Sequence, residues 1–395
     1  MNSEKKPNSI LRRERQLRGW SQQKVAELVG TSEDVMSRWE RGERKPSPFF
    51  QEKLCILYGK TAEELEFIQP CLNPLSTIIT QATDIQQAIN ERLDQAESII
   101  NLGWEAWFAS RPKQATIEVT KLLPNLERMI YMPLATVHLL HTKELIIRSH
   151  GLLGAIYLDA LQKDLAFYYY TQAHKVAEEI HDTNLTATYL ALIGDVLRQQ
   201  NDKVTALSYM ENARDRAATY ADPATLGHIL QLLAYAYSDI GNGSAFEQTI
   251  SKATDLLAFT GEGRDTVKKE FIPFEIYEIQ GKANRDLGKP LKAIPYLELA
   301  EKSLNKAESM TPRWHALLEI SRGQVLYDAG DITTAIGMVS KGFIMAYQSH
   351  SPHQMNRVLK LLRKLENGPF KNYPGVQDLK NLLYETYLRM DNSAM

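Results

Sequence analysis

Apolar residues recur every three to four positions along most of this 395-residue chain, from about residue 85 onward. This spacing places apolar side chains on one face of an α-helix, whereas a half-buried strand would alternate at every second residue. No clear strand pattern occurs, and the shorter segments before residue 66 also follow the helical spacing. The pattern therefore predicts an all-α protein built from many amphipathic helices.

Small residues repeat along the helical region at nearly regular intervals. The first set recurs after 40, 40, 47 and 42 residues and consists of Gly154, Gly194, Ala234, Gly281 and Gly323. Twelve residues after each comes a second set, and seven further on a third: Ala166, Ala206, Phe246, Ala293 and Ala335, then Ala173, Ala213, Ala253, Ala300 and Gly342. We expect two antiparallel helices to approach closely at these positions, around a larger residue such as Tyr170, Met210 or Leu297. A sixth, degenerate unit is expected at Gly103, Ala115 and Leu122.

The repeated offsets are similar to those of the tetratricopeptide repeat, although these units exceed the ~34 residues typical of that family. The resemblance implies a right-handed α-solenoid of helix pairs over residues 85–390. Two final helices within residues 352–390 would cap the stack or pair with another chain. A stack of this kind has a concave groove lined by the first helix of each pair. By the same resemblance, the groove residues would be Arg148, Asp159, Asp195, Arg198, His228, Gln231, Tyr235, Asp239, Lys282, Arg285, Gln324 and Tyr327.

Residues 21–42 read as two short helices that meet at a glycine. Ser21 precedes the first helix, where its hydroxyl can accept a hydrogen bond from a free backbone N–H group. Gly30 lies where the chain must turn, and glycine adopts a left-handed conformation without a steric penalty. Met36 and Trp39 are spaced so that the second helix turns both of them toward a core. The segment therefore predicts a compact helix–turn–helix unit.

The flanking segments extend this unit. Leu11 and Leu17 are expected to anchor a preceding helix, and Leu28 is expected on the apolar face of the first motif helix. The whole segment resembles the Xre/Cro-like helix-turn-helix domain, which implies a small five-helix-type DNA-binding domain over residues 8–66. We interpret residues 67–84 as a connector to the repeat domain.

The resemblance assigns DNA contacts residue by residue. The start of the recognition helix supplies the base contacts, which places them at Ser32, Glu33, Asp34, Ser37 and Arg38. Phosphate contacts fall at Gln22, Arg12, Arg18, Arg44 and Lys45. Of these residues, Arg38 is the best base reader, because a guanidinium can bond two atoms of a guanine edge.

Two acidic residues at the start of the recognition helix depart from the family pattern. Glu33 and Asp34 either satisfy the helix dipole and its free backbone donors, or one of them accepts a hydrogen bond from a cytosine amino group. If both face phosphates, they weaken binding. The sequence leaves these alternatives open.

Charge is distributed unevenly, since residues 1–60 carry 13 Lys/Arg against 8 Asp/Glu and the rest of the chain has a balance of −7. A basic head on an acidic body suits a head that contacts DNA while the body stays clear of phosphates. Cys55 and Cys71 have no disulfide or metal-site spacing, so we expect reduced thiols. His138 and His141 lack a further ligand at metal spacing, and no metal, cofactor or enzyme activity is expected. No run of ~18 apolar residues occurs, so we expect a cytoplasmic protein without a membrane span.

Head and body together resemble the RRNPP-type regulators, in which a helical-repeat body binds a secreted peptide and forms the dimer. The resemblance implies a homodimeric, sequence-specific transcription regulator of double-stranded DNA that senses a short peptide, as in quorum sensing. Two recognition helices would then enter successive major grooves about 34 Å apart. The alternative is an interaction protein whose repeat domain binds a protein partner, while the head only tethers it to DNA.

Overall fold

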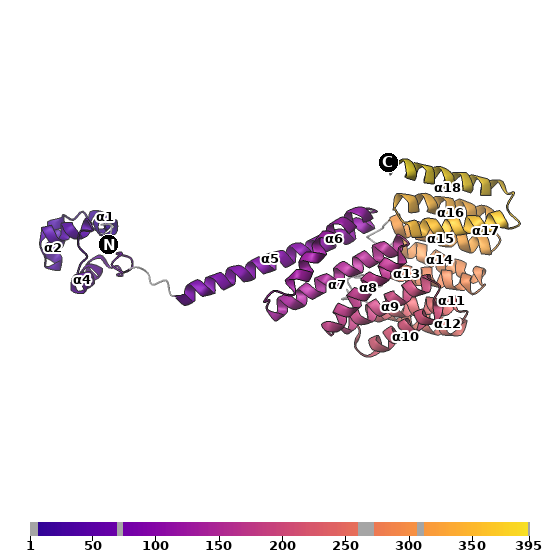
Figure 1. Ribbon diagram of the computed structural model, residues 1–395, viewed down its shortest axis with the longest axis horizontal. Coiled ribbons are helices and arrows are strands. Elements are labelled where there is room, and N and C mark those ends of the chain that lie inside the picture. Colours follow the sequence, from indigo (N-terminus) through magenta and orange to yellow (C-terminus); the bar gives the residue numbers. More distant parts are fainter. Residues whose placement is uncertain (1–6, 69–73, 260–271, 306–311, 394–395) are drawn as a thin grey trace. The chain divides into compact units, whose positions relative to one another are not determined.

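The computed structural model describes residues 7–68, 74–259, 272–305 and 312–393, which form eighteen α-helices, one short 3-10 helix and no strand (Figure 1). The chain divides into two compact units, the head (residues 1–88) and the body (residues 89–395). The division lies inside one continuous helix, α5 (Pro74–Phe108). Cys71 lies outside the described residues, and Cys55 is a half-buried free thiol. The protein is all-α, as the apolar spacing predicts.

Four short helices and a single turn form the head before α5. The helices are α1 (Ser9–Leu17), α2 (Gln22–Val29), α3 (Glu33–Glu40) and α4 (Pro48–Tyr58). Leu11, Met36 and Trp39 are almost fully buried, so the prediction that Met36 and Trp39 face a core is confirmed. Leu65 and Phe67, which follow α4, complete this core.

The fifth element of the head is one helical turn rather than a full helix. The backbone N–H of Thr61 donates to Glu64 (2.8 Å), and the N–H of Glu64 donates to the Thr61 hydroxyl (3.1 Å). This reciprocal pair is a capping box, which favours the start of a helix. Glu66 then adopts a left-handed conformation (φ 55°), which ends the helical path after one turn.

Two apolar residues that were expected to anchor the head are exposed instead. Leu17 is 69% exposed because it ends α1, directly before the turn that contains Gly19 (φ 66°). Leu28 is 47% exposed, since Val25 and Val29, one turn apart, already fill the narrow buried face of α2. The apolar spacing therefore predicted a wider core-facing stripe than these short helices have.

The predicted connector is partly helical. Residues 74–84 belong to α5, so the expected boundary at residue 85 falls inside this helix. Pro74 is the first residue of α5, a position where proline is favoured because its fixed φ suits a helix and its missing N–H has no intrahelical partner. The apolar spacing continues across the boundary without a turn signal, which explains the long helix.

The helices of the body from α7 to α16 pack in consecutive antiparallel pairs, α7 with α8 through α15 with α16, and α18 then contacts both α16 and α17 less extensively. Its helices after α5 are α6 (Pro112–Met129), α7 (Thr136–Asp159), α8 (Lys163–Glu179), α9 (Thr183–Gln199), α10 (Lys203–Tyr220), α11 (Pro223–Asp239), α12 (Gly243–Leu256), η1 (Leu257–Phe259), α13 (Pro273–Asp286), α14 (Pro290–Leu304), α15 (Pro312–Asp328), α16 (Ile332–Gln348), α17 (Pro352–Asn367) and α18 (Pro374–Ser393). The predicted stack of helix pairs is confirmed.

The recurring glycines lie where the paired helices approach most closely. A Cβ atom on Gly194 would lie 2.7 Å from the Met210 side chain, and one on Gly281 would lie 2.5 Å from Leu297. Real Cβ atoms do not approach other atoms this closely, so a larger residue would force the pair apart. A Cβ atom on Gly103 would lie 3.2 Å from Val119 of α6, sixteen residues later, and 2.8 Å from Leu152 of α7, so the small residue of the expected sixth unit lies where α5 meets both α6 and α7.

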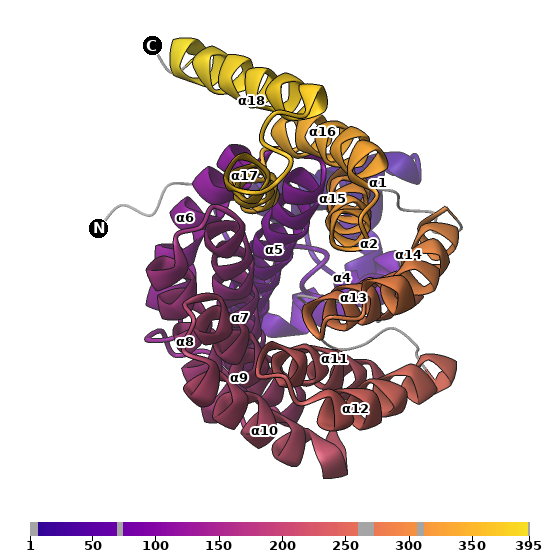
Figure 2. The same ribbon diagram turned by 90° about the vertical axis from the view of Figure 1, so that its right-hand side faces the viewer.

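The stack curves until its two ends meet. Figure 2 shows the helices from α7 to α17 running around a common centre. Arg313, at the start of α15, donates to Oδ2 of Asp159 at the end of α7 (2.6 Å), and Ser351 donates to Oδ1 of the same carboxylate (2.6 Å). The Arg313 guanidinium also lies 4.8 Å from the ring centre of Trp107 on α5. We call these four residues the closing contact.

Candidate DNA-binding surface and inner polar network

The recognition helix α3 presents a polar, exposed face. Ser32 is its N-cap, and the Ser32 hydroxyl accepts from the N–H of Val35 (3.4 Å). Glu33, Asp34 and Arg38 are exposed, whereas Ser37 is half-buried. Four of the five predicted base-reading residues are therefore exposed on or beside one helix, and Ser32 is also engaged in capping.

The strongest base-reading candidate is paired within its own helix. Arg38 Nη2 lies 2.8 Å from the Asp34 carboxylate one turn earlier, and the two side chains are 50% and 63% exposed. An exposed pair of this kind contributes at most about 1 kcal/mol, so it can open. While the pair is formed, however, the negative charge of Asp34 neutralises part of the positive charge that Arg38 would offer to a DNA base.

An ion pair that the sequence motif does not predict fixes the recognition helix within the head. Arg15 on α1 donates two hydrogen bonds to Glu40 at the end of α3 (2.7 and 2.9 Å), and Glu40 is only 4% exposed. The hydrogen bond to Glu40 is the main cause that raises the Arg15 pKa. The sequence carries a signal for this pair. Arg15 and Glu40 each lie four positions after a buried residue, Leu11 and Met36, which places both charged side chains on the core-facing sides of their helices.

The predicted phosphate contacts fall into two groups. Arg12, Arg44 and Lys45 are exposed, and their side chains are available for DNA. Gln22, however, donates to the buried carboxylate of Glu40 (2.7 Å). Its side chain is committed within the head, which differs from the expected phosphate contact.

Arg18 is likewise bound within the head. Its guanidinium donates to the Glu14 carboxylate and to the carbonyl oxygen of Tyr58, both at 2.7 Å. It also lies 5.1 Å from the Tyr58 ring centre, and the Trp20 ring stacks on Tyr58 at 6.4 Å. Burial, followed by the charge of Glu40, raises the Tyr58 pKa to about 12. Arg18 therefore joins α1 to α4, while the residue itself remains exposed.

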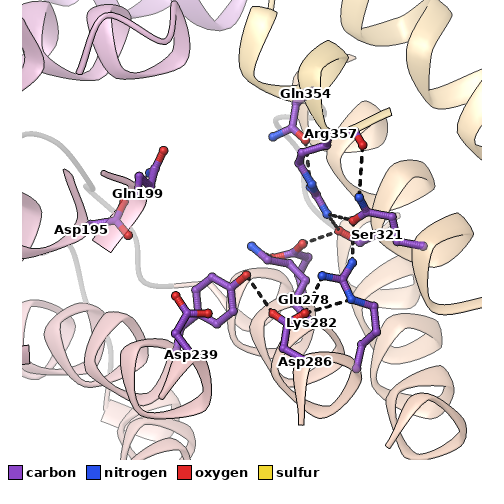
Figure 3. A network of polar contacts seen from close by, with 12 residues as sticks. Asp195, Gln199, Asp239, Glu278, Lys282, Asp286, Ser321, Gln354 and Arg357 are labelled. Carbon is purple, nitrogen blue, oxygen red and sulfur yellow. Dashed lines mark hydrogen bonds and ion pairs between the residues drawn. The ribbon is translucent and has the colours of Figure 1, made fainter. Parts of the chain in front are cut away.

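In the body, charged and amide side chains from five helices form one connected set, which we call the inner polar network (Figure 3). Its members are Asp195, Arg198 and Gln199 on α9, Tyr235 and Asp239 on α11, Glu278, Lys282, Arg285 and Asp286 on α13, Ser321, Gln324 and Asp328 on α15, and His353, Gln354 and Arg357 on α17. Figure 3 shows the labelled side chains directed from several helices toward a shared space. The first helices of successive pairs supply all of them, as expected for a groove.

Arg198 is the centre of the α9–α11 part of the network. It lies 2.7 Å from Asp195 and 2.9 Å from Asp239, and its guanidinium is 4.4 Å from the Tyr235 ring centre. Burial opposes the charge on Arg198, but the two carboxylates outweigh this effect and raise the Arg198 pKa. Burial, together with the charge of Asp286, raises the pKa of Tyr235. This part of the network has more carboxylates than cations.

The other part joins α13, α15 and α17. Lys282 lies 3.3 Å from Glu278, and Ser321 donates to the same carboxylate (2.6 Å). Arg285 and Arg357 each donate to the side-chain oxygen of Gln324, both at 2.7 Å. The amide of Gln324 thus holds two guanidinium groups from different helices in place.

Some predicted groove residues lie outside this network. Arg148 pairs with Glu97 and donates to Asn101 on α5. His228 and Gln231 are buried among the helices, and Tyr327 packs against the apolar cluster of α15–α18. On α11, Gln231 and His228 lie one and two turns before Tyr235, and Arg148 lies on α7, which supplies no residue of the network.

The remaining side-chain chemistry is limited. Across the described ranges, no three His, Cys, Asp or Glu side chains are placed to hold a metal ion. Among the helices that the structure describes, none is both long enough and apolar enough to cross a membrane. His138, one of the two histidines singled out in the sequence, lies 2.8 Å from the Asn90 side chain.

Residues 10–67 match the family model of a helix-turn-helix domain. No curated protein matches the chain. A solved structure of a Rap protein complexed with competence and sporulation factor is 15% identical, with a TM-score of 0.48, and the match covers 76% of this chain and 78% of that one. The apo form of the quorum sensor NprR from B. thuringiensis is 12% identical, with a TM-score of 0.41 and coverage of 78% and 95%. Aspartyl phosphate phosphatase F from Bacillus subtilis is 15% identical, with a TM-score of 0.39 and coverage of 90% and 97%.

Proposed function

We propose that this protein is a sequence-specific, DNA-binding transcription regulator whose body binds a short peptide and forms a homodimer. The observation that carries the proposal is the exposed polar face of α3 within a head that matches the helix-turn-helix family model. In domains of this kind the second motif helix lies in the major groove. The head is therefore the part of the protein that binds the partner, double-stranded DNA.

The geometry of the head supports this function. Met36 and Trp39 anchor one face of α3 in the core, and the Arg15–Glu40 pair fixes its C-terminal end. A recognition helix held in this way presents Arg38 from a rigid support, so little ordering is needed when DNA binds. Arg44 and Lys45 supply sequence-independent phosphate contacts beside it.

The inner polar network supports the binding of a peptide by the body. An extended peptide backbone needs hydrogen-bond partners, and its side chains need places of matching charge. Carboxylates, cations, amides and the Tyr235 hydroxyl gather from five helices in this network. The peptide acts by preferring one arrangement of the homodimer, because a ligand with equal affinity for both arrangements shifts neither.

Fluorescence anisotropy tests the proposal. Purified full-length protein is titrated against duplexes tiled across the promoter of its own gene, with a random duplex as control, at two salt concentrations. We expect selective binding with two protomers per duplex. Arg38→Ala should relax the preference at one base position, while Arg13→Ala, an exposed arginine of α1 outside the predicted contacts, should not.

A different result of the same titration would refute the proposal. Equal binding to every duplex, falling steeply with salt, would leave only phosphate contacts and refute sequence-specific regulation. The function would then be that of an interaction protein, in which the body binds a protein partner and the head is a tether.

A further inference from the structure

The cations of the inner polar network differ in how they are neutralised. Arg198 pairs with Asp195 and Asp239, and Lys282 pairs with Glu278. Arg285 is also paired, with Asp286 (2.5 Å) and Asp328 (3.6 Å). Three of the four cations therefore have a carboxylate partner within the protein.

Arg357 on α17 is the exception. Its guanidinium donates only to neutral acceptors, the side-chain oxygens of Gln354 (2.9 Å), Ser321 (2.9 Å) and Gln324 (2.7 Å). Within the described ranges it forms no ion pair. The Ser321 hydroxyl stands between Arg357 and the nearest carboxylate of this part of the network, because it donates to Glu278 (2.6 Å) while accepting from Arg357.

We propose that Arg357 binds a carboxylate of the ligand that occupies the inner polar network. This inference rests on the proposed function of the body as a peptide-binding domain, and it names the chemical group that the domain recognises. The carboxylate belongs either to the C-terminus of the peptide or to an Asp or Glu side chain.

The surroundings of Arg357 favour an anion. Among the described residues, Arg357 has no directly paired carboxylate, and the charges of Glu278 and Asp286, which oppose the effect of burial, are more distant. A carboxylate bound to the guanidinium therefore stabilises the cation further. Burial is the main cause that lowers the Arg357 pKa. The three neutral acceptors hold the guanidinium in a fixed position, so a carboxylate can bind it with two parallel hydrogen bonds at little entropic cost.

The charge of the network selects a monoanion at this place. Asp195 and Asp239 give the α9–α11 part a surplus of negative charge, which repels an anion toward α17. His353, one turn before Arg357, adds no positive charge at neutral pH, because burial and the nearby cations lower its pKa to about 3. One guanidinium without a directly paired carboxylate thus offers a place for one ligand carboxylate, whereas a phosphate dianion would add a second negative charge to a network whose five carboxylates already outnumber its four cations.

The test uses full-length protein and three pools of N-acetylated heptapeptides. The first pool has free C-terminal carboxylates and no Asp or Glu, the second has C-terminal amides and one Glu, and the third has C-terminal amides and no acidic residue. Bound peptides are identified by affinity selection and mass spectrometry, and their Kd values are then measured. The variants are Arg357→Gln, the charge-conserving Arg357→Lys and a control, Arg363→Gln, which removes an exposed arginine from the same helix.

We expect wild-type protein to retain peptides from the first or the second pool, which identifies the source of the carboxylate, and not from the third. Arg357→Gln should weaken this binding at least tenfold, Arg357→Lys should weaken it less, and Arg363→Gln should leave it unchanged. Circular dichroism establishes that each variant is folded. Equal retention of all three pools, or unchanged Kd values in Arg357→Gln, would overturn the assignment while peptide binding stands. Retention from no pool would overturn both the assignment and the proposed peptide-binding function.

Discussion

Breaking the closing contact should destabilise the body more than breaking any exposed ion pair does. Substitution of Arg313 by methionine removes the guanidinium but keeps a long apolar side chain beside Trp107. The lost interactions are the 2.6 Å ion pair with Asp159, the 2.9 Å hydrogen bond to the carbonyl oxygen of Ser349 and the contact of the guanidinium with the Trp107 ring. The Arg313 and Asp159 side chains are only 7% and 15% exposed, so Asp159 would remain as a poorly solvated carboxylate.

The magnitude follows from this burial. Removing one partner of a buried ion pair costs about 3–5 kcal/mol, because the other charge is left uncompensated. Asp159 retains the 2.6 Å hydrogen bond from Ser351 and some contact with water, which reduces the loss. We therefore expect Arg313→Met to lower the free energy of unfolding by about 2–3 kcal/mol.

Urea unfolding at pH 7, followed by circular dichroism at 222 nm, measures this loss. Stacked repeats usually contact only their neighbours, so a contact between distant repeats should also sharpen the transition, and the variant should unfold more broadly. Arg322→Met is the matched control on the same helix, because the Arg322–Glu301 pair is more exposed, and its loss should cost less than about 1 kcal/mol. A change below about 0.5 kcal/mol in Arg313→Met, or a loss no larger than that of the control, would refute the reasoning.

Three further predictions concern packing, DNA binding and pH. Gly281→Ala should destabilise the body by about 1–3 kcal/mol in urea, because the new Cβ would lie 2.5 Å from a side chain of the paired helix. The control is Gly337→Ala, on an exposed helical position with open space around it, which should be neutral or stabilise the body by up to about 1 kcal/mol. If Gly281→Ala and Gly337→Ala both destabilise the body, the packing argument is wrong. Asp34→Asn should tighten DNA binding several-fold in anisotropy titrations, since it frees Arg38 and removes a negative charge; weaker binding would mean that Asp34 itself contacts DNA. His353 has its pKa lowered to about 3, so as pH falls below about 6.5 the unfolded chain takes up a proton that the folded body does not. Between pH 6.5 and 5 the wild-type body should therefore lose stability by up to about 1.4 kcal/mol per pH unit more than His353→Asn, and parallel profiles would contradict this assignment.

The repeat architecture could be predicted from the sequence because it depends on local offsets. Gly154 and Gly194 precede their large partners, Tyr170 and Met210, by sixteen residues, and both pairs meet in the structure. A helix pair with a short turn fixes which residues face each other, so small residues at constant spacing identify the contact. The same reasoning found the core positions Met36 and Trp39.

The polar contacts between distant helices could not be predicted in the same way. The place of Asp159 opposite Arg313 depends on the accumulated curvature of the stack, to which each pair adds a small rotation. Arg357 could not be found from the sequence because the last helices carry no repeat signature and were expected only to cap the stack or pair with another chain. Leu17 and Leu28 were assigned to the core because apolar spacing in a short helix does not show how wide the buried face is.

The inner polar network and the closing contact depend on the same two helices, α15 and α17. Arg313 lies in the first turn of α15, which also carries two acceptors of the Arg357 guanidinium, and Ser351 is the N-cap of α17. Under the proposed peptide binding, a ligand that reached from the acidic α9–α11 part to Arg357 would contact both sides of the stack, and the closing contact would keep those sides at a fixed separation. Such a ligand would bind the closed form more tightly than a form in which Arg313 and Asp159 were separated. By linkage, ligand binding and closure must strengthen each other by the same factor.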